Sequence, residues 1–198
     1  QLEETLKEFG QVSLVGKSFG VLRVHGLDID WSLPRTDSAG RKPEVAIDPH
    51  MNIQDAFARR DLTINAMGIN LATKELIDPF GGKKDLPKKI LRAPNISFFT
   101  QDPLRFYRVM QFVSRFEMYP DEQLNALCKA MDVSAISRER IESEFEKMLL
   151  KSKRPSLGIR WLQKIDRLKD VLPELYATIG VKQDPRWHPE GDVFEHTM

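Results

Sequence analysis

Residues 59–66 read Arg-Arg-Asp-Leu-Thr-Ile-Asn-Ala, and the rest of the sequence is interpreted outward from this stretch. It concentrates polar side chains directly before an apolar segment. A guanidinium offers a forked donor that suits phosphate or the edge of a base, and Asp and Asn can hold a ribose hydroxyl. The alternative is a helix end, where Arg favours the helix dipole and Asp61 pairs with a neighbouring Arg. Taken alone, the stretch leaves both interpretations open.

The residues before this stretch carry the pattern of a helix followed by short strands. Residues 2–9 have apolar side chains at helical spacing, and Gly10 is placed to end the helix. The next apolar segments are short and separated by gaps that contain glycine, which is typical of strands joined by tight turns. The segments are residues 12–15, 21–24 and 27–33, with gaps at Gly16 to Gly20 and at His25-Gly26.

In the third segment apolar and polar residues alternate, which places Asp28 and Asp30 on one face of a strand. Carboxylates that share a face are the ligands that metal ions need in nucleotidyl transfer. Two aspartates on an exposed strand face are also common without such a role, so this pair alone decides nothing.

Between this segment and residue 59 the sequence predicts a loop and then a helix. Residues 34–50 are polar and rich in Pro, Asp, Arg and Gly, which indicates a mobile loop. Asn52 is placed to cap a helix that runs to about Arg59, with Asp55 at the capping-box position.

The sequence after the opening stretch changes from turn and strand signals to helical ones. Asp78-Pro-Phe-Gly-Gly reads as a turn, and helical periodicity dominates from Ile96 to about Tyr176. The predicted fold class is therefore α+β, a small α/β part followed by an all-helical part, with the boundary near Pro94.

Asp102-Pro103 is a strong helix start, with Asp at the N-cap and Pro at the first helical position. Arg105 and Arg108 follow one turn apart on the more polar face of that helix. An Asp and an Arg held on one rigid helix can present an acceptor and a donor to a base edge, and a plain cap with a solvated basic face is the alternative. The apolar stripe of the same helix is Leu104, Tyr107, Met110 and Val113.

Composition bounds the class of protein. The 198 residues are 41% hydrophobic and 30% charged, as in ordinary soluble proteins, and the net charge is only +1, so nucleic-acid binding must rest on local clusters. No apolar run approaches the roughly 20 residues that span a bilayer, and the polar N-terminus is unlike a targeting signal. Cys128 lies at helical spacing from two leucines, which predicts a buried thiol. Because it is the only cysteine, it cannot form an internal disulfide, which suits a reducing compartment and favours a cytoplasmic protein.

Taken in order, these segments resemble the class II tRNA nucleotidyltransferase (CCA-adding) and bacterial poly(A) polymerase family over essentially the whole chain. The most specific match is residues 59–66 to the signature R-R-D-[FL]-T-[IM]-N-A, and Asp102-Pro-Leu-Arg105 resembles the E-D-x-x-R template for the incoming nucleotide. Three further segments match in the right order. They are Ile77-Asp-Pro-Phe-Gly-Gly, Ile136-Ser-Arg-Glu-Arg-Ile, and the segment from Asp184 to Thr197, which resembles the entry to an HD-type domain.

The resemblance implies a fold and an activity. It implies part of a polymerase-beta-like head domain with a mixed sheet at 1–93, a helical neck and body at 94–180, and the start of an HD-type domain at 181–198, in a chain truncated at both ends. The enzyme would add C and/or A residues to tRNA 3′ ends from CTP or ATP with Mg²⁺, using protein side chains as the template.

The resemblance also assigns residues, with Asp61 and Asn65 near the ribose and Asp102 and Arg105 on the Watson–Crick edge of the base. Two positions depart from the pattern. Gln101 replaces the usual Glu, a harmless change if the base contacts come from Asp102 and Arg105. Gln111 replaces a common Arg, which predicts a weaker or differently arranged hold on the triphosphate. The nucleotide-binding residues implied are Arg60, Asp61, Asn65, Asp102, Arg105 and Arg108.

On the metal side, Asp30 best matches the auxiliary catalytic carboxylate, since it stands five residues before Arg35, and Asp28 is less favoured. The first motif of the family, a Gly-Gly turn before a D-x-D strand that holds both metal ions, has no counterpart, because the only Gly-Gly is Gly81-Gly82. The chain by itself is therefore expected to have little or no activity.

Other interpretations stay open. The motifs do not separate CCA addition from A-only, CC-only or poly(A) addition. An HD-type metal phosphohydrolase is suggested by His196, but His188 and His196 are eight residues apart with no third ligand in reach by sequence. A non-catalytic RNA-binding module would use the basic residues Arg138, Arg140, Lys147, Lys151, Lys153 and Arg154.

Overall fold

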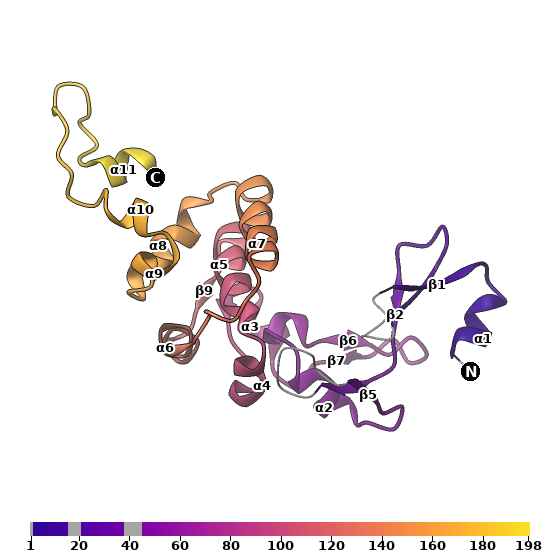
Figure 1. Cartoon of the computed structure of the whole chain (residues 1–198). Helices are drawn as coiled ribbons and strands as arrows, with labels where there is room; N and C mark the ends of the chain where they lie inside the picture. Colours follow the sequence, from indigo (N-terminus) through magenta and orange to yellow (C-terminus); the bar gives the residue numbers. More distant parts are fainter. Residues whose placement is uncertain (1, 16–20, 38–44) are drawn as a thin grey trace. The chain divides into compact units, whose positions relative to one another are not determined.

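The computed structural model describes residues 2–15, 21–37 and 45–198 (Figure 1). The predicted turn from Gly16 to Gly20 and residues 38–44 of the predicted loop lie outside this range. The chain divides into two compact units, one up to Ala58 and one from Arg59 to Met198. Among the described helices, none combines the length and apolar character of a bilayer-spanning segment.

The first unit begins with a helix followed by short strands, as predicted, and the strands form a three-stranded antiparallel sheet. Val12 pairs with Val24 and Leu22 with Trp31, and a small core of Leu6, Leu22 and Val24 lies between the helix and the sheet. These elements are α1 (Leu2–Lys7), β1 (Val12–Val15), β2 (Val21–Val24) and β3 (Asp30–Trp31).

The predicted third strand, 27–33, is much too long. Only Asp30–Trp31 pairs with β2, and Asp28 lies outside the strand, so the two aspartates do not share a strand face. The reason is that the chain turns at Gly26, whose φ is +83°, and the Leu27 N–H donates to the Val24 carbonyl. Within the described part of the chain, residues 27–29 therefore have no partner strand opposite them, and alternation alone does not make a strand.

The prediction of a loop over 34–50 is wrong for its two ends. β4 (Arg35–Asp37) and β5 (Val45–Ile47) pair antiparallel, with Arg35 opposite Ile47. Ladder hydrogen bonds join backbone groups, so the polar strand β4 can pair with the short apolar strand β5. The predicted helix after this hairpin is confirmed as α2 (Ile53–Ala58), since the Asp55 N–H donates to Asn52 Oδ1 at 2.8 Å.

The second unit opens with short elements and becomes helical from Ile96, as predicted. One exception is a short parallel pairing of β8 (Ile90–Leu91) with β9 (Tyr119–Pro120), which ties together residues before and after α5 (Leu104–Phe116). The short elements are η1 (Thr63–Asn65), β6 (Gly68–Ile69), β7 (Leu76–Ile77), α3 (Gly82–Asp85), β8 (Ile90–Leu91) and β9 (Tyr119–Pro120). The helices are α4 (Ile96–Gln101), α5 (Leu104–Phe116), α6 (Glu122–Ala130), α7 (Arg138–Lys151), α8 (Ser156–Lys164), α9 (Leu168–Val171), α10 (Pro173–Tyr176) and α11 (Val193–Thr197).

Helix α5 is the centre of this unit and packs against α7 and α8 (Figure 1). Its contact with α8 is close, because a Cβ on Gly158 would lie 2.5 Å from Ser114 Oγ and 2.8 Å from the Met110 carbonyl oxygen. The Gly158 N–H donates to Ser114 Oγ, and that hydroxyl donates to the Pro155 carbonyl. A glycine is therefore needed where the two helices meet.

The predicted stripe of α5 is buried at Tyr107, Met110 and Val113, and the core extends beyond it to Phe106 and Val109. The core consequently covers most of the helix circumference and leaves Arg105 and Arg108 at its edge. The predicted buried thiol is also confirmed, since Cys128 is fully buried and burial raises its pKa to about 12. The predicted domain boundary near Pro94 stays a prediction.

Candidate nucleotide-binding site

The stretch 59–66 is bonded to helix α5 through Asp61. Arg108 Nε donates to Asp61 Oδ2 at 2.8 Å, and its Nη2 lies 2.6 Å from the same oxygen. The other carboxylate oxygen accepts from Asn65 Nδ2 at 3.0 Å and from the Leu62 N–H at 2.8 Å. Three residues predicted to bind nucleotide thus form one bonded group, although 47 positions separate Asp61 from Arg108.

Asp61 is held as a carboxylate by this group. The side chain is only 9% exposed, and burial by itself would raise the pKa of Asp61. The positive charge of Arg108 and the hydrogen bonds from Asn65, Arg108 and the Leu62 N–H outweigh burial, so the pKa of Asp61 lies below its ordinary value. Asp61 thus pairs with Arg108 of a distant helix, and not with the neighbouring arginine that the helix-end interpretation predicted.

The opposite side of the stretch is fixed by helix α3. The Thr63 hydroxyl donates to Asp85 Oδ2 at 2.7 Å, and the Thr63 N–H donates to the Arg92 carbonyl. A Cβ on Gly82 would lie 2.2 Å from the Thr63 carbonyl oxygen, so the backbones are in direct contact. The predicted turn is confirmed here, since Asp78 accepts from the N–H groups of Gly82 and Lys83. The turn therefore acts as the support of η1.

The start of helix α5 carries Asp102 and Arg105. Pro103 already has helical dihedral angles, and Asp102 is extended and accepts from the Leu104 N–H at 3.2 Å, which confirms the predicted cap. Arg140, from α7, also donates to Asp102 at 3.2 Å. Asp102 therefore lies at the surface of the unit, between two helices.

Arg105 is largely immobilised by main-chain groups. Its Nη1 donates to the Phe98 carbonyl at 2.6 Å and its Nη2 to the Arg59 carbonyl at 2.5 Å. A guanidinium has five N–H donors, so three remain after these two bonds. Burial lowers the pKa of Arg105, and a guanidinium keeps its charge in proteins. The plane and orientation of the Arg105 guanidinium are therefore fixed.

The other predicted residues of this region differ in exposure. Arg60 is exposed and forms no ion pair or side-chain hydrogen bond with another described residue, so its guanidinium can reach a ligand. Gln101 is exposed as well, but Gln111 is only 2% exposed and belongs to the core. Position 111 therefore faces inward, away from the polar edge of α5.

The candidate metal residue Asp30 belongs to the first unit and is considered by itself. Its carboxylate is 57% exposed and accepts from Arg23 Nε at 2.8 Å. Asp28 is exposed outside any strand. Neither forms part of a group of three potential ligands within the described residues, so these carboxylates do not by themselves fit a pair of Mg²⁺ ions.

Half of the basic residues proposed to contact RNA are paired with carboxylates. Arg138 pairs with Glu142, Arg140 with Asp102, and Lys147 with the buried Glu144. Exposed cations remain at the end of α7 and in the following turn, at Lys151, Lys153 and Arg154.

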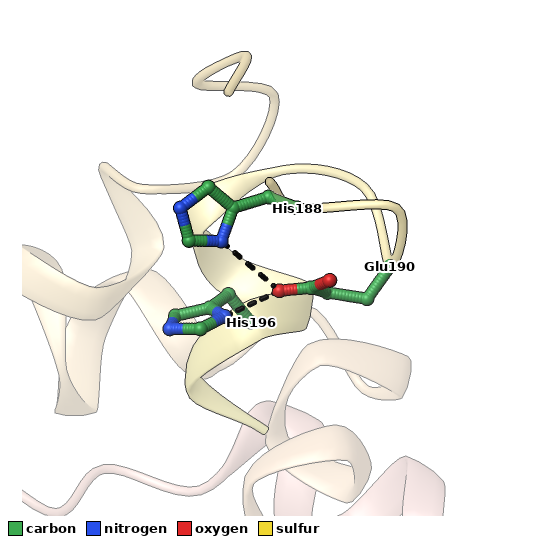
Figure 2. A group of neighbouring side chains, drawn as sticks. All are labelled: His188, Glu190 and His196. Atoms are coloured by element: carbon green, nitrogen blue, oxygen red, sulfur yellow. Dashed lines mark hydrogen bonds and ion pairs between the residues drawn. The ribbon is translucent and has the colours of Figure 1, made fainter. Parts of the chain in front are cut away.

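A second cluster of functional side chains lies near the C-terminus, and its third member was missed from the sequence. Glu190 lies between His188 and His196, and one of its oxygens contacts Nδ1 of both rings (Figure 2). The Glu190 backbone N–H and the hydrogen bonds from His196 and His188 lower the pKa of Glu190 to about 2. The spacing His-x-Glu was the available signal.

A separate surface hollow of about 470 Å³ around Lys169 and Tyr176 contains none of the predicted site residues.

Comparison with known proteins agrees with the sequence motifs. Residues 13–92 match the family model of the poly A polymerase head domain. Among curated proteins, the multifunctional CCA protein of Herminiimonas arsenicoxydans is 37% identical over 193 residues, covering 93% of this chain and 46% of the relative. The multifunctional CCA protein of Methylococcus capsulatus is 35% identical, covering 93% of this chain and 45% of the relative. The chain thus spans about half the length of these relatives.

Solved structures share the fold. The Thermotoga maritima CCA-adding enzyme complexed with tRNA is 28% identical with a TM-score of 0.67, covering 95% of this chain and 43% of that one. The Bacillus stearothermophilus CCA-adding enzyme in complex with CTP is 25% identical with a TM-score of 0.71, covering 86% of this chain and 42% of that one. The predicted mixed fold of sheet and helices is confirmed.

Proposed function

We propose, since this chain belongs to the tRNA nucleotidyltransferase and poly(A) polymerase family, that it carries the nucleotide-reading part of an enzyme that adds C and/or A residues to tRNA 3′ ends. CTP and ATP are the nucleotides and the tRNA 3′ end is the acceptor. The relatives named as CCA proteins favour CCA addition over poly(A) synthesis. The proposed domains are those predicted from the sequence, with the reading residues at the start of the helical one.

The observation that carries this proposal is the bonded group of Asp61, Asn65 and Arg108 beside the immobilised Arg105. A selective nucleotide site needs polar groups that are fixed before the ligand arrives, because each immobilised side chain otherwise costs about 0.5–1.5 kcal/mol on binding. In this group the carbonyl of Arg59 orients Arg105, and Arg108 orients Asp61, so the signature and the helix fix each other.

The chemistry of Asp102 and Arg105 fits C and A. Both bases present an amino donor next to a ring-nitrogen acceptor on the Watson–Crick edge, whereas U and G present a carbonyl next to an N–H. A carboxylate only accepts and a guanidinium only donates, so the pair matches C and A and opposes U and G. We assign Asp61 and Asn65 to the ribose, and Arg60 and Arg108 to further contacts with the nucleotide.

Nucleotidyltransferases of this fold generally use a divalent metal ion. We propose Mg²⁺, with Asp30 as the auxiliary carboxylate and Asp28 as the less favoured one. Because the described carboxylates of this chain do not fit a metal pair, no step of the reaction is assigned to them. The 198 residues alone are accordingly expected to incorporate little CTP or ATP into tRNA that lacks its 3′ end. The proposed location of the reaction is the cytoplasm.

Binding of nucleotide tests the proposal directly. Calorimetric titration with CTP and ATP should show saturable binding to the wild-type chain and at least tenfold weaker binding, about 1.4 kcal/mol, to Asp102→Ala and Arg105→Ala. Arg138→Ala is the matched control, since it removes an exposed arginine that pairs only along its own helix. Equal affinity in all four proteins would contradict the assignment of the site.

A further inference from the structure

We propose that four lysines form the surface on which the phosphate backbone of the RNA substrate docks. The inference rests on the proposed function for the identity of the RNA, and it concerns a segment that supplies none of the nucleotide-reading residues. The lysines lie in α3 and in the turn that joins it to β8, and all four are exposed. They are Lys83, Lys84, Lys88 and Lys89.

This segment concentrates positive charge that the rest of the chain lacks. Residues 81–92 contain five basic residues and one acidic residue, a net charge of +4, whereas the whole chain carries +1. The rest of the chain therefore sums to −3. Contacts between clustered basic side chains and phosphates supply much of the affinity of proteins for nucleic acid, so a local excess of charge counts for more than the total.

The four lysines have no carboxylate partner within the described residues. The one acidic residue of the segment, Asp85, is buried and already bonded, because its Oδ2 accepts from the Thr63 hydroxyl at 2.7 Å and lies 3.3 Å from Arg92 Nε. On α7, by contrast, half of the basic residues of the alternative RNA surface are paired with carboxylates. The lysines of residues 83–89 therefore lose no ion pair when they bind phosphate.

The backbone beneath the lysines is fixed by hydrogen bonds. Asp78 accepts from the N–H groups of Gly82 and Lys83 at 2.8 and 2.9 Å. The Leu86 N–H donates to the Gly82 carbonyl at 2.9 Å, and the Lys89 N–H donates to the Leu86 carbonyl at 3.1 Å. Binding of RNA therefore has to order the lysine side chains and not the segment that carries them, which lowers its entropic cost.

The position of the segment favours RNA as the partner. It supports the signature stretch, since the Thr63 N–H donates to the Arg92 carbonyl and the Thr63 hydroxyl donates to Asp85. The ring of Tyr119, whose N–H donates to the Lys89 carbonyl, is exposed and is the kind of side chain on which unpaired bases stack. An RNA whose 3′ end enters the reading site can therefore place its phosphates along residues 83–89.

The salt dependence of RNA binding tests this surface. Fluorescence anisotropy with tRNA that lacks its 3′-terminal CCA gives the association constant, and the slope of its logarithm against the logarithm of the salt concentration is about 0.7–0.9 per phosphate contact. The test variant is Lys83→Gln/Lys84→Gln/Lys88→Gln/Lys89→Gln. It should bind the tRNA at least about tenfold more weakly than wild type at about 0.1 M salt, with a slope smaller by roughly 3. An unchanged slope would overturn the proposal.

A matched variant removes the same charge from four exposed cations of α7, α8 and the turn between them. It is Lys151→Gln/Lys153→Gln/Arg154→Gln/Lys164→Gln, and its slope should differ from that of wild type by less than about 1. A larger loss of slope in this variant than in the first would assign the RNA contacts to the helical part and overturn the proposal. Circular dichroism verifies that both variants are folded.

Calorimetric titration with CTP separates this inference from the proposed function. A wild-type chain that binds tRNA through the lysines but binds no CTP would support the surface and contradict the reading site. Loss of CTP binding together with tRNA binding in the lysine variant would overturn the inference that the surface acts separately from the reading site. Lysine-dependent binding to phosphatidylserine vesicles in place of tRNA would overturn the choice of partner.

Discussion

The Asp30–Arg23 pair of the first unit and the Asp61–Arg108 pair of the second have the same chemistry and different surroundings. The carboxylate of Asp30 is 57% exposed beside Arg23, whereas that of Asp61 is 9% exposed beside Arg108 and has further donors in Asn65 and the Leu62 N–H. An exposed pair is screened by water and leaves its members free to exchange partners, and a buried group with every oxygen bonded is rigid. The comparison indicates that the Asp61 group is built into the core of its unit, while the Asp30 carboxylate is available to exchange partners.

The largest effect should follow from removing Asp61. Asp61→Ala leaves Arg108 and Asn65 without their acceptor in a half-buried position, so we expect the free energy of unfolding to fall by about 3 kcal/mol. Urea unfolding measures it, and CTP binding should weaken in parallel. A loss below about 0.5 kcal/mol would mean that the Asp61–Arg108 pair is no more structural than an exposed one.

The second effect tests the support beneath the stretch. Gly82→Ala forces a Cβ against the Thr63 carbonyl, and since backbone cannot rotate away, we expect a cost of about 2 kcal/mol and weaker nucleotide binding. Gly81→Ala is the neighbouring control. Gly81 has φ +77° and open space around it. Gly81→Ala should therefore lower the free energy of unfolding by about 1 kcal/mol through backbone strain and leave the nucleotide affinity unchanged. Equal loss of affinity in both variants would argue against direct support of η1 by Gly82.

Lowering the pH should remove the stability that the ionised Asp61 carboxylate contributes, and with it part of the difference in stability between the Asp61–Arg108 and Asp30–Arg23 pairs. Because the pKa of Asp61 is lower in the folded chain than its ordinary value of 3.8, its contribution is fully present above that value and is lost as the pH falls through the folded-state pKa. The stability of wild type should therefore approach that of Asp61→Asn as the pH falls below about 4. Parallel unfolding free energies for the two proteins from about pH 6 to about pH 3 would contradict the coupling.

The smallest effect should come from Asp30. Asp30→Ala removes an exposed ion pair, so the free energy of unfolding should change by no more than about 0.5 kcal/mol. Differential scanning calorimetry at low and high salt measures this change. A cost comparable to that of Asp61→Ala would show that Asp30 is held as rigidly as Asp61.

The sequence predicted the parts of the fold that depend on local signals. The cap at Asp102, the buried stripe of α5 and the turn at Asp78 each follow from neighbouring residues, and all three are confirmed. Strand β4 was missed because backbone pairing needs no apolar pattern, and β5 because its three apolar residues lie in an otherwise polar segment. Strand β3 was predicted too long because alternation does not reveal whether a partner strand lies opposite.

The contacts of the site depend on tertiary packing and were not predictable in the same way. Neither the bond between Asp61 and Arg108, 47 positions apart, nor the capture of Arg105 by the Arg59 carbonyl has a local signal. Glu190 was missed for a related reason, because the reversal at Gly191 brings its carboxylate to His196. The roles of Asp30 and of the nucleotide-binding residues stay predictions.

The most direct test is the affinity of the chain for all four nucleoside triphosphates. If Asp102 and Arg105 read the base edge, CTP and ATP should bind at least tenfold more tightly than UTP and GTP, a difference of about 1.4 kcal/mol. Asp102→Asn, whose amide both donates and accepts, should reduce that difference. Equal affinity for the four nucleotides in the wild-type chain would contradict the proposal that these two side chains select the base.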